Sequence, residues 1–154
     1  MSPRLDVSMT RDEVNQFLEV SRVAVLTTLG PGGWPHAAGM WYVCVDDTLR
    51  MWTYAKSQKA VNLARDARCA AVVEAGEQYE ELRGVLIKAR ATLTSRYDEV
   101  IAIGHALYER YTKPRTGISF DAGPALEIER QARKRVGILL PLQSLSSWDH
   151  GKLR

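Results

Sequence analysis

The chain has 154 residues, a net charge of +3 at pH 7, and hydrophobic and charged fractions of 45% and 25%. These values exclude disordered and fibrous classes and fit one domain over residues 1–154, which would bury roughly two-thirds of the surface of the unfolded chain. The chain contains no apolar run of about eighteen residues and no signal-like segment, so we expect a cytoplasmic protein without a membrane partner.

The charged residues and the cysteines give no sign of a nucleic-acid or metal partner. The basic residues of 130–135 have acidic neighbours at Glu127 and Glu129, which indicates a solvated helix face. Cys44 and Cys69 lie in predicted strands among apolar residues, so we expect buried free thiols and no disulfide. No Cys or His pair has the spacing of metal ligands, and we therefore expect no metal site.

The first part of the chain predicts a short helix and two strands. Thr10 and Glu13 have the spacing of a capping box at a helix start. A strand over 22–28 follows, and the residues of 30–33 have the composition of a hairpin turn. A long second strand is predicted over 35–45.

A third strand over 49–54 ends at a polar turn, where a helix over 57–67 begins. Ser57 stands at the N-cap position of this helix. A helix start offers backbone N–H groups without partners and a partial positive charge. Because Lys56 and Lys59 flank Ser57, the pattern indicates a phosphate site. On these residues alone, an ordinary turn with solvated lysines is an equal alternative.

The second half of the chain alternates strands and helices. The pattern predicts strands over 69–75, 84–95 and 136–140, and helices over 97–111 and 124–134 with a loop over 112–123 between them. We expect a mainly β fold of the α+β class: a six-stranded antiparallel barrel with peripheral helices. The serine-rich tail is not assigned to a strand.

Several short motifs carry a resemblance to a known family. They are Val23–Thr28, Gly33–His36, Met40–Tyr42, Thr53–Asn62, Leu82–Val85 and Ser147–Leu153. In this order and spacing, the chain resembles the flavin and deazaflavin oxidoreductases of the pyridoxamine 5′-phosphate oxidase-like split-barrel superfamily. More narrowly, it resembles the B-type branch that is associated with the deazaflavin coenzyme F420. The resemblance covers nearly the whole chain and implies a split-barrel homodimer with two cofactor sites between the subunits.

The resemblance also implies which residues contact the cofactor. The flavin-phosphate motif of the family, Ser-Arg-Lys at a helix start, falls on Ser57-Gln58-Lys59. Gln58 replaces the arginine, and this departure leaves the choice between F420 and FMN open. The implied contacts are Lys56, Ser57 and Lys59 at the phosphate, Thr53, Tyr54, Met40, Trp41 and Tyr42 along the ring system, and Asn62, Arg83 and Trp148 near them.

These residues also have structural interpretations. Asn62 is equally suited to satisfying a backbone group of its helix. Arg83 could pair with the glutamates that precede it, and Trp41 and Trp148 could be core or interface aromatics. We interpret His36 as a structural residue.

The chain shows no nucleophile–base constellation and no Walker or Rossmann glycine pattern, so a bound cofactor would have to carry any chemistry. No catalytic residue is assigned. From the resemblance, the first hypothesis is a reductase that uses reduced F420 to transfer a hydride to an unsaturated small molecule. Water, Tyr54 or Tyr42 would donate the proton, and Lys56, Lys113 and Arg115 are candidates to hold the anionic tail of the coenzyme.

Two alternatives remain open from the sequence. The first is an FMN-binding oxidoreductase of the same fold, and the second is a non-catalytic protein that stores or delivers F420. True pyridoxamine phosphate oxidase activity is not expected, because the chain is short and has no basic cluster suited to a second phosphate. The sequence does not indicate whether the loop over 112–123 closes over a site.

Overall fold

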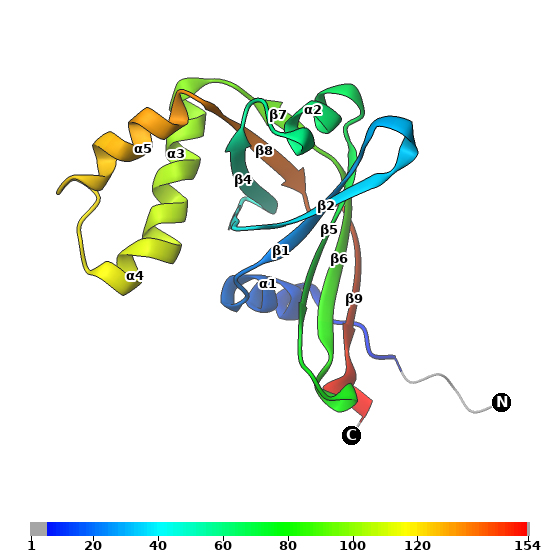
Figure 1. Ribbon diagram of the computed structural model, residues 1–154. Helices are drawn as coiled ribbons and strands as arrows, with labels where there is room; N and C mark the ends of the chain where they lie inside the picture. Colours follow the sequence, from blue (N-terminus) through cyan, green and yellow to red (C-terminus); the bar gives the residue numbers. More distant parts are fainter. Residues whose placement is uncertain (1–5, 154) are drawn as a thin grey trace.

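The computed structural model describes residues 6–153, which form two antiparallel sheets with helices around them (Figure 1). Residues 1–5, part of the segment where no signal sequence is expected, and residue 154 lie outside the described part. The larger sheet has the order β2-β1-β5-β6-β9 and the smaller sheet has the order β3-β4-β8-β7. This arrangement confirms the expected α+β class and the antiparallel split barrel.

The bounds of the elements follow the chain. The strands are β1 (Ala24–Leu29), β2 (Pro35–Met40), β3 (Val43–Val45), β4 (Thr48–Tyr54), β5 (Arg68–Ala75), β6 (Arg83–Arg90), β7 (Thr92–Thr94), β8 (Arg135–Pro141) and β9 (Ser144–Asp149). The helices are α1 (Arg11–Val20), α2 (Gln58–Arg65), α3 (Tyr97–Leu107), α4 (Lys113–Thr116) and α5 (Pro124–Ala132), and a π-helical turn (Tyr108–Thr112) joins α3 to α4.

The described part of the chain has nine strands, and the expected number of six is therefore wrong. The expected strand over 35–45 is divided, because the chain leaves the larger sheet after Met40 and enters the smaller sheet at Val43. The expected strand over 84–95 is divided in the same way at Ala91. The serine-rich tail, for which the pattern predicts no strand, forms β9 at the edge of the larger sheet.

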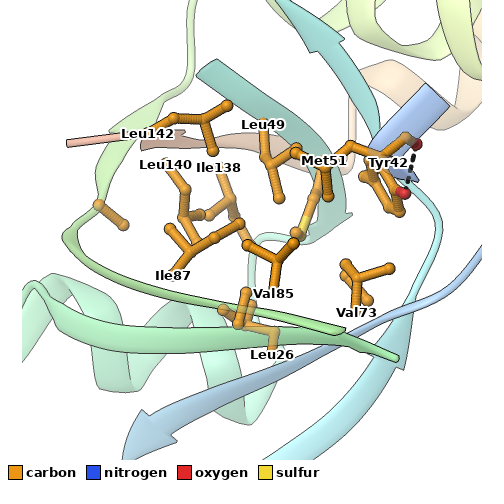
Figure 2. Packing of buried hydrophobic residues seen from close by; sticks show 14 of the residues in the cluster. Leu26, Tyr42, Leu49, Met51, Val73, Val85, Ile87, Ile138, Leu140 and Leu142 are labelled. Carbon is orange, nitrogen blue, oxygen red and sulfur yellow. Dashed lines mark hydrogen bonds between the residues drawn. The ribbon is translucent and has the colours of Figure 1, made fainter. Parts of the chain in front are cut away.

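The hydrophobic core fills the space between the two sheets (Figure 2). Alternate residues of each strand share the inner face and are almost completely buried there. The core side chains that Figure 2 labels on the strands are Leu26, Val73, Val85 and Ile87 of the larger sheet and Leu49, Met51, Ile138 and Leu140 of the smaller sheet. Val14, Phe17 and Leu18 of α1 pack against the same core.

The helices α3 and α5 cover the outer face of the smaller sheet (Figure 1). Gly104 allows α3 to approach closely, because a Cβ atom there would lie 2.5 Å from Cζ3 of Trp52 on β4. The expected loop over 112–123 contains the short helix α4. Within residues 6–153, no helix lies on the outer face of the larger sheet (Figure 1).

Both predicted N-caps are confirmed. The Thr10 hydroxyl accepts a hydrogen bond from the N–H of Glu13 (3.2 Å), and the Ser57 hydroxyl accepts one from the N–H of Ala60 (3.3 Å). The carboxylate of Glu13 forms an ion pair with Lys152 (Oε2–Nζ 2.8 Å), which joins the start of α1 to the C-terminal turn. The helices therefore begin where local capping chemistry predicts.

Candidate functional site

The strand-to-helix junction that the sequence predicts is formed by β4 and α2. β4 ends at Tyr54 and α2 begins at Gln58, with Ser57 as its N-cap. The N–H of Ala60 is capped by Ser57, while the N–H groups of Gln58 and Lys59 have no partner within residues 6–153. The first turn of α2 therefore presents two unpaired donors at the positive end of the helix dipole.

Hydrogen bonds between side chains fix α2 to both sheets. Thr53 of β4 is buried, and its hydroxyl donates to Ser57 Oγ over 3.2 Å. Asn62 Nδ2 donates to Thr28 Oγ1 of β1 (3.0 Å), and Asn62 Oδ1 accepts from Gln58 Nε2 (2.7 Å). Because the Asn62 amide is fully buried and already paired, it positions the helix, and its expected contact with a cofactor stays a prediction. Thr53 likewise supports the start of the helix, because its hydroxyl donates to the N-cap residue Ser57.

Two lysines remain without ion-pair partners at this junction. Lys56 is exposed and Lys59 is half-buried, and neither forms a salt bridge within the described part of the chain. In contrast, Lys113 pairs with Glu109 (Nζ–Oε2 3.0 Å) and lies with Arg115 on α4, at the end of α3 far from α2 (Figure 1). Within one chain, the structure does not bring Lys113 and Arg115 to Lys56.

The chain passes from the larger sheet to the smaller one at Met40, Trp41 and Tyr42. Tyr42 is completely buried, and its hydroxyl donates to the carbonyl oxygen of Leu18 over 2.6 Å. Burial raises the pKa of Tyr42 to about 12. Within one chain the hydroxyl is therefore not exposed to donate a proton, and the expectation that Tyr42 covers a ring stays a prediction. Met40 is half-buried against the core, whereas Trp41 is 47% exposed although it stacks on Tyr111 (centroids 4.5 Å apart).

Two strand edges are left unpaired beside this corner. β3 pairs only with the residues 48–50 of β4, so the edge of β4 over 51–54 has no strand neighbour on that side within residues 6–153. β2 is the edge of the larger sheet and pairs with β1 alone. The two strands leave the corner in different directions (Figure 1). We call the region between these free edges and the start of α2 the opening of the split barrel.

His36 of β2 contributes an unpaired polar atom to this region. It lies opposite Thr28 in the β1–β2 ladder, so both side chains project from the same face as the Thr28–Asn62 contact. The Nδ1 atom of His36 is buried and has no hydrogen-bond partner in the part of the chain that the structure describes. Buried polar atoms nearly always have a partner. This atom therefore indicates room for a further hydrogen-bonding group, which the sequence interpretation of His36 missed.

Arg83 and Trp148 project from opposite faces of the larger sheet. Gly84 is the register partner of Trp148, and Arg83 is the partner of Asp149, so these consecutive positions face opposite ways. The Arg83 guanidinium lies over the ring of Phe17 at 5.3 Å on the α1 side and forms no salt bridge within residues 6–153. Both residues lie at the end of the sheet remote from α2 (Figure 1). One chain therefore does not bring them to the phosphate junction or to each other.

A cavity of about 580 Å³ lies at the α2 end of the larger sheet. Thr28, the partner of Asn62, lines it together with three cations, Arg68, Lys88 and Arg90. Arg68 pairs with Asp66 (NH2–Oδ2 2.7 Å). In the sequence, the alternating basic residues Lys88 and Arg90 of β6 are the feature that could have indicated this cavity, but the same pattern fits the exposed face of an ordinary strand.

The described residues contain no group of three or more His, Cys, Asp or Glu side chains that could hold a metal ion. Among the helices of residues 6–153, none has the length and apolar character required to cross a membrane. Cys44 and Cys69 lie in strands as expected, and both are free and partly buried.

Comparisons with known proteins agree with this geometry. The family model described as pyridoxamine 5′-phosphate oxidase matches residues 10–137. The solved structure of the conserved hypothetical protein Rv2991 from Mycobacterium tuberculosis is 37% identical, with a TM-score of 0.87 over 99% of this chain and 92% of that chain. A search of curated proteins found no significant match.

More distant solved structures show the same fold. A protein described as an F420 reductase is 22% identical, with a TM-score of 0.64 over 86% of this chain and 94% of that chain. HutZ, described as the heme storage protein from Vibrio cholerae, is 16% identical, with a TM-score of 0.68 over 90% of this chain and 94% of that chain. At these identities, the likeness is evidence of the fold alone.

Proposed function

Because the chain belongs to the pyridoxamine 5′-phosphate oxidase family of split-barrel proteins, we propose that it is an oxidoreductase that binds coenzyme F420. More specifically, we propose a reductase in which reduced F420 supplies a hydride to an unsaturated small molecule. The observation that carries this proposal is the β4–α2 junction, where the capped helix start lies beside two lysines without ion-pair partners.

The residues at the junction fit a phosphate group. The free N–H groups of Gln58 and Lys59 point out of the first turn of α2, and the Lys56 and Lys59 ammonium groups supply positive charge. The unpaired His36 Nδ1 and the free edge of β4 offer hydrogen-bonding groups beside the opening. Lys56, Ser57 and Lys59 would hold the phosphate, and Tyr54, which is 55% exposed, is a hydroxyl at the same end of β4 that could donate a proton.

We also propose that two chains form a homodimer through the outer face of the larger sheet. No helix of residues 6–153 covers this face (Figure 1), and it carries the exposed side chains of Val23 and Val25. Trp148 projects from the same face, so one subunit could place it beside the cofactor of the other subunit. Trp41 keeps an exposed ring surface that is available for the same purpose.

An FMN-binding oxidoreductase is the second candidate. Gln58 stands where the family motif has arginine, and its amide is bonded to Asn62, so it adds no charge at the phosphate. The two lysines therefore carry the electrostatic attraction for either cofactor. A carrier that stores F420 without turnover is the third candidate. Of the two hydroxyls considered as proton donors, Tyr42 is buried and Tyr54 alone is exposed, so the chain offers few groups for catalysis.

Cofactor binding to the purified protein tests these candidates. Quenching of tryptophan fluorescence would give the Kd of F420 and of FMN for the unmodified protein and for the variants Lys59→Ala and Lys152→Ala. We expect tighter binding of F420, and a loss of about tenfold or more in affinity for Lys59→Ala, since a charge-assisted hydrogen bond contributes about 1.5–3 kcal/mol. Lys152→Ala serves as the matched control, because its ammonium group is paired with Glu13 at the C-terminal turn, away from α2.

The outcomes separate the candidates. If the protein binds FMN more tightly than F420, FMN becomes the proposed cofactor. Equal losses of affinity in both variants would show that the junction is not a specific phosphate site. If F420 binds, reduced F420 is then offered with a panel of unsaturated acceptors. Binding without oxidation of the coenzyme by any acceptor would favour the carrier.

A further inference from the structure

Arg135 is held between two aromatic rings at the end of β4. Its guanidinium carbon lies 4.6 Å from the ring centroid of Trp52 and 4.2 Å from that of Tyr54. Arg135 is the first residue of β8 and is the register partner of Tyr54. Cation–π contact with both rings restricts the movement of the guanidinium.

This cation lacks an acidic partner. Arg135 takes part in no salt bridge within residues 6–153, and its Nε atom is buried without a hydrogen-bond partner. A buried N–H donor nearly always has an acceptor, and a planar guanidinium with free donors matches a carboxylate or a phosphate in a bidentate manner. An anionic group would therefore match both the charge and the unpaired donor of Arg135.

The two segments of chain that meet beside Arg135 supply positive charge and no acid. The backbone N–H of Ala55 donates to the carbonyl oxygen of Lys134 over 2.9 Å, so the start of β8 is joined to the turn that precedes Ser57. Lys56 and Lys134 are both exposed beside this bond. Neither 52–65 nor 130–148 contains an Asp or a Glu. The local field therefore extends from the N-cap of α2 to Arg135 without a neutralising carboxylate in either segment.

We propose that Arg135 forms a second anion-binding position that adjoins the phosphate position at Ser57, and that it takes a carboxylate or a further phosphate of an extended ligand. The identity of that ligand rests on the proposed function. F420 continues beyond its phosphate into an anionic glutamate tail, whereas FMN ends at its phosphate. Arg135 is then a specificity residue that favours the ligand with the longer anionic chain.

The test compares two arginines that stand two positions apart. Arg135→Met keeps the aliphatic stem between the rings and removes the charge. Arg133→Met is the matched control, because it removes the same charge from an exposed arginine whose guanidinium lies 5.3 Å from the ring of Tyr97. Kd values for F420 and FMN are measured for both variants at low and at high salt. Urea unfolding of Arg135→Met and of Arg135→Lys checks that the fold is retained.

We expect Arg135→Met to weaken F420 binding about tenfold while FMN binding changes less than about twofold, and we expect Arg133→Met to change neither. The loss should shrink at high salt, where the ionic contact is screened. Equal losses for both cofactors, or no loss for F420, would overturn the proposal. The proposal would also be overturned if a folded Arg135→Met variant kept its full affinity for F420 while Arg133→Met lost affinity for F420.

A second measurement keeps the inference testable if neither cofactor binds, an outcome that would refute the proposed function alone. Inorganic pyrophosphate and a γ-linked triglutamate are titrated into the unmodified protein and into both variants by calorimetry. Binding of either polyanion that is lost in Arg135→Met and kept in Arg133→Met would support the anion position. Absence of binding, or binding that both variants retain, would overturn it.

Discussion

Asn62 of α2 and Thr28 of β1 are both almost completely buried and are joined by a hydrogen bond of 3.0 Å between Nδ2 and Oγ1. Gln58 and Arg65 donate to the other end of the same amide over 2.7 Å and 3.2 Å. The amide therefore connects the helix that carries the candidate phosphate site to the core of the larger sheet. Asn62 therefore supports the N-cap of α2, at which the proposed phosphate group would bind.

Loss of this contact should lower the free energy of unfolding. Asn62→Ala leaves the buried hydroxyl of Thr28 without its donor, and we expect a loss of about 1–3 kcal/mol. Thr28→Val should also destabilise the protein. The double variant should lose less than the sum of the single losses, because neither unpaired partner remains. Urea unfolding of the four proteins gives the coupling energy, and strictly additive losses would show that the hydrogen bond does not contribute.

Local signals predicted the parts of the fold and the site that lie within one stretch of chain. The caps at Thr10 and Ser57 depend on residues three positions apart, and the alternation of Val85 and Ile87 depends on a period of two. The strand-to-helix junction that carries Lys56, Ser57 and Lys59 was predictable for the same reason, since these residues are close in sequence. The structure places these features on the elements that the pattern indicated.

Contacts between distant parts of the chain were not predictable. Tyr42 fits a ring-facing strand position in the sequence, but in the fold it is buried in the core, and its hydroxyl donates to the carbonyl oxygen of Leu18, which lies 24 positions away. Arg135 reaches its rings only through the β4–β8 ladder. The serines of β9 carry no apolar alternation, and their strand exists because the edge of β6 is there to pair with. Nothing local distinguishes such a segment from a loop.

Gly84 on β6 should not tolerate a side chain. A Cβ atom at Gly84 would lie 2.1 Å from Cζ2 of Trp148, far below a van der Waals contact. We expect Gly84→Ala to lower the free energy of unfolding by about 1–3 kcal/mol, because the indole ring must move out of its place against the sheet. Trp148→Leu in the same chain should recover part of the loss, because it removes the ring that clashes. Thermal unfolding of the single and double variants measures this, and a neutral Gly84→Ala would contradict the close packing.

Arg110 joins the end of α1 to the rest of the barrel through hydrogen bonds. Its NH2 group donates to the carbonyl oxygens of Leu18 (3.0 Å), Glu19 (2.8 Å) and Ser21 (2.6 Å). We expect Arg110→Met to lower the free energy of unfolding by about 2–4 kcal/mol, because these carbonyl oxygens lose a charged donor near the end of the helix.

Arg110→Lys should restore only a small part of that loss, because an ammonium group does not reproduce the planar fork of donors. Arg22→Met is the control, since Arg22 is exposed and makes a single long hydrogen bond of 3.3 Å to the carbonyl oxygen of Arg110. We expect it to change the free energy of unfolding by less than about 1 kcal/mol. Urea unfolding would contradict the role of Arg110 if the lysine variant were as stable as the unmodified protein.

Stability should fall at alkaline pH because a partly buried thiol, Cys69, and a buried phenol, Tyr42, keep their protons in the folded protein. Burial raises the pKa of Cys69 from an ordinary value of 9.0 to about 11 and that of Tyr42 from 10.0 to about 12. The unfolded chain therefore loses these protons first. The free energy of unfolding contributed by each group is fully present below its ordinary pKa and declines as the pH rises toward its folded pKa.

The pH ranges in which Cys69 and Tyr42 lower the stability can be separated by substitution. Cys69→Ala should flatten the decline between about pH 9 and pH 11, and Tyr42→Phe should flatten it between about pH 10 and pH 12. The comparison uses slopes, because each substitution also changes stability at neutral pH through lost packing or lost hydrogen bonds. Urea unfolding of the three proteins from pH 8 to pH 12 gives these slopes. If the slopes of both variants match that of the unmodified protein, the two groups do not retain their protons through burial.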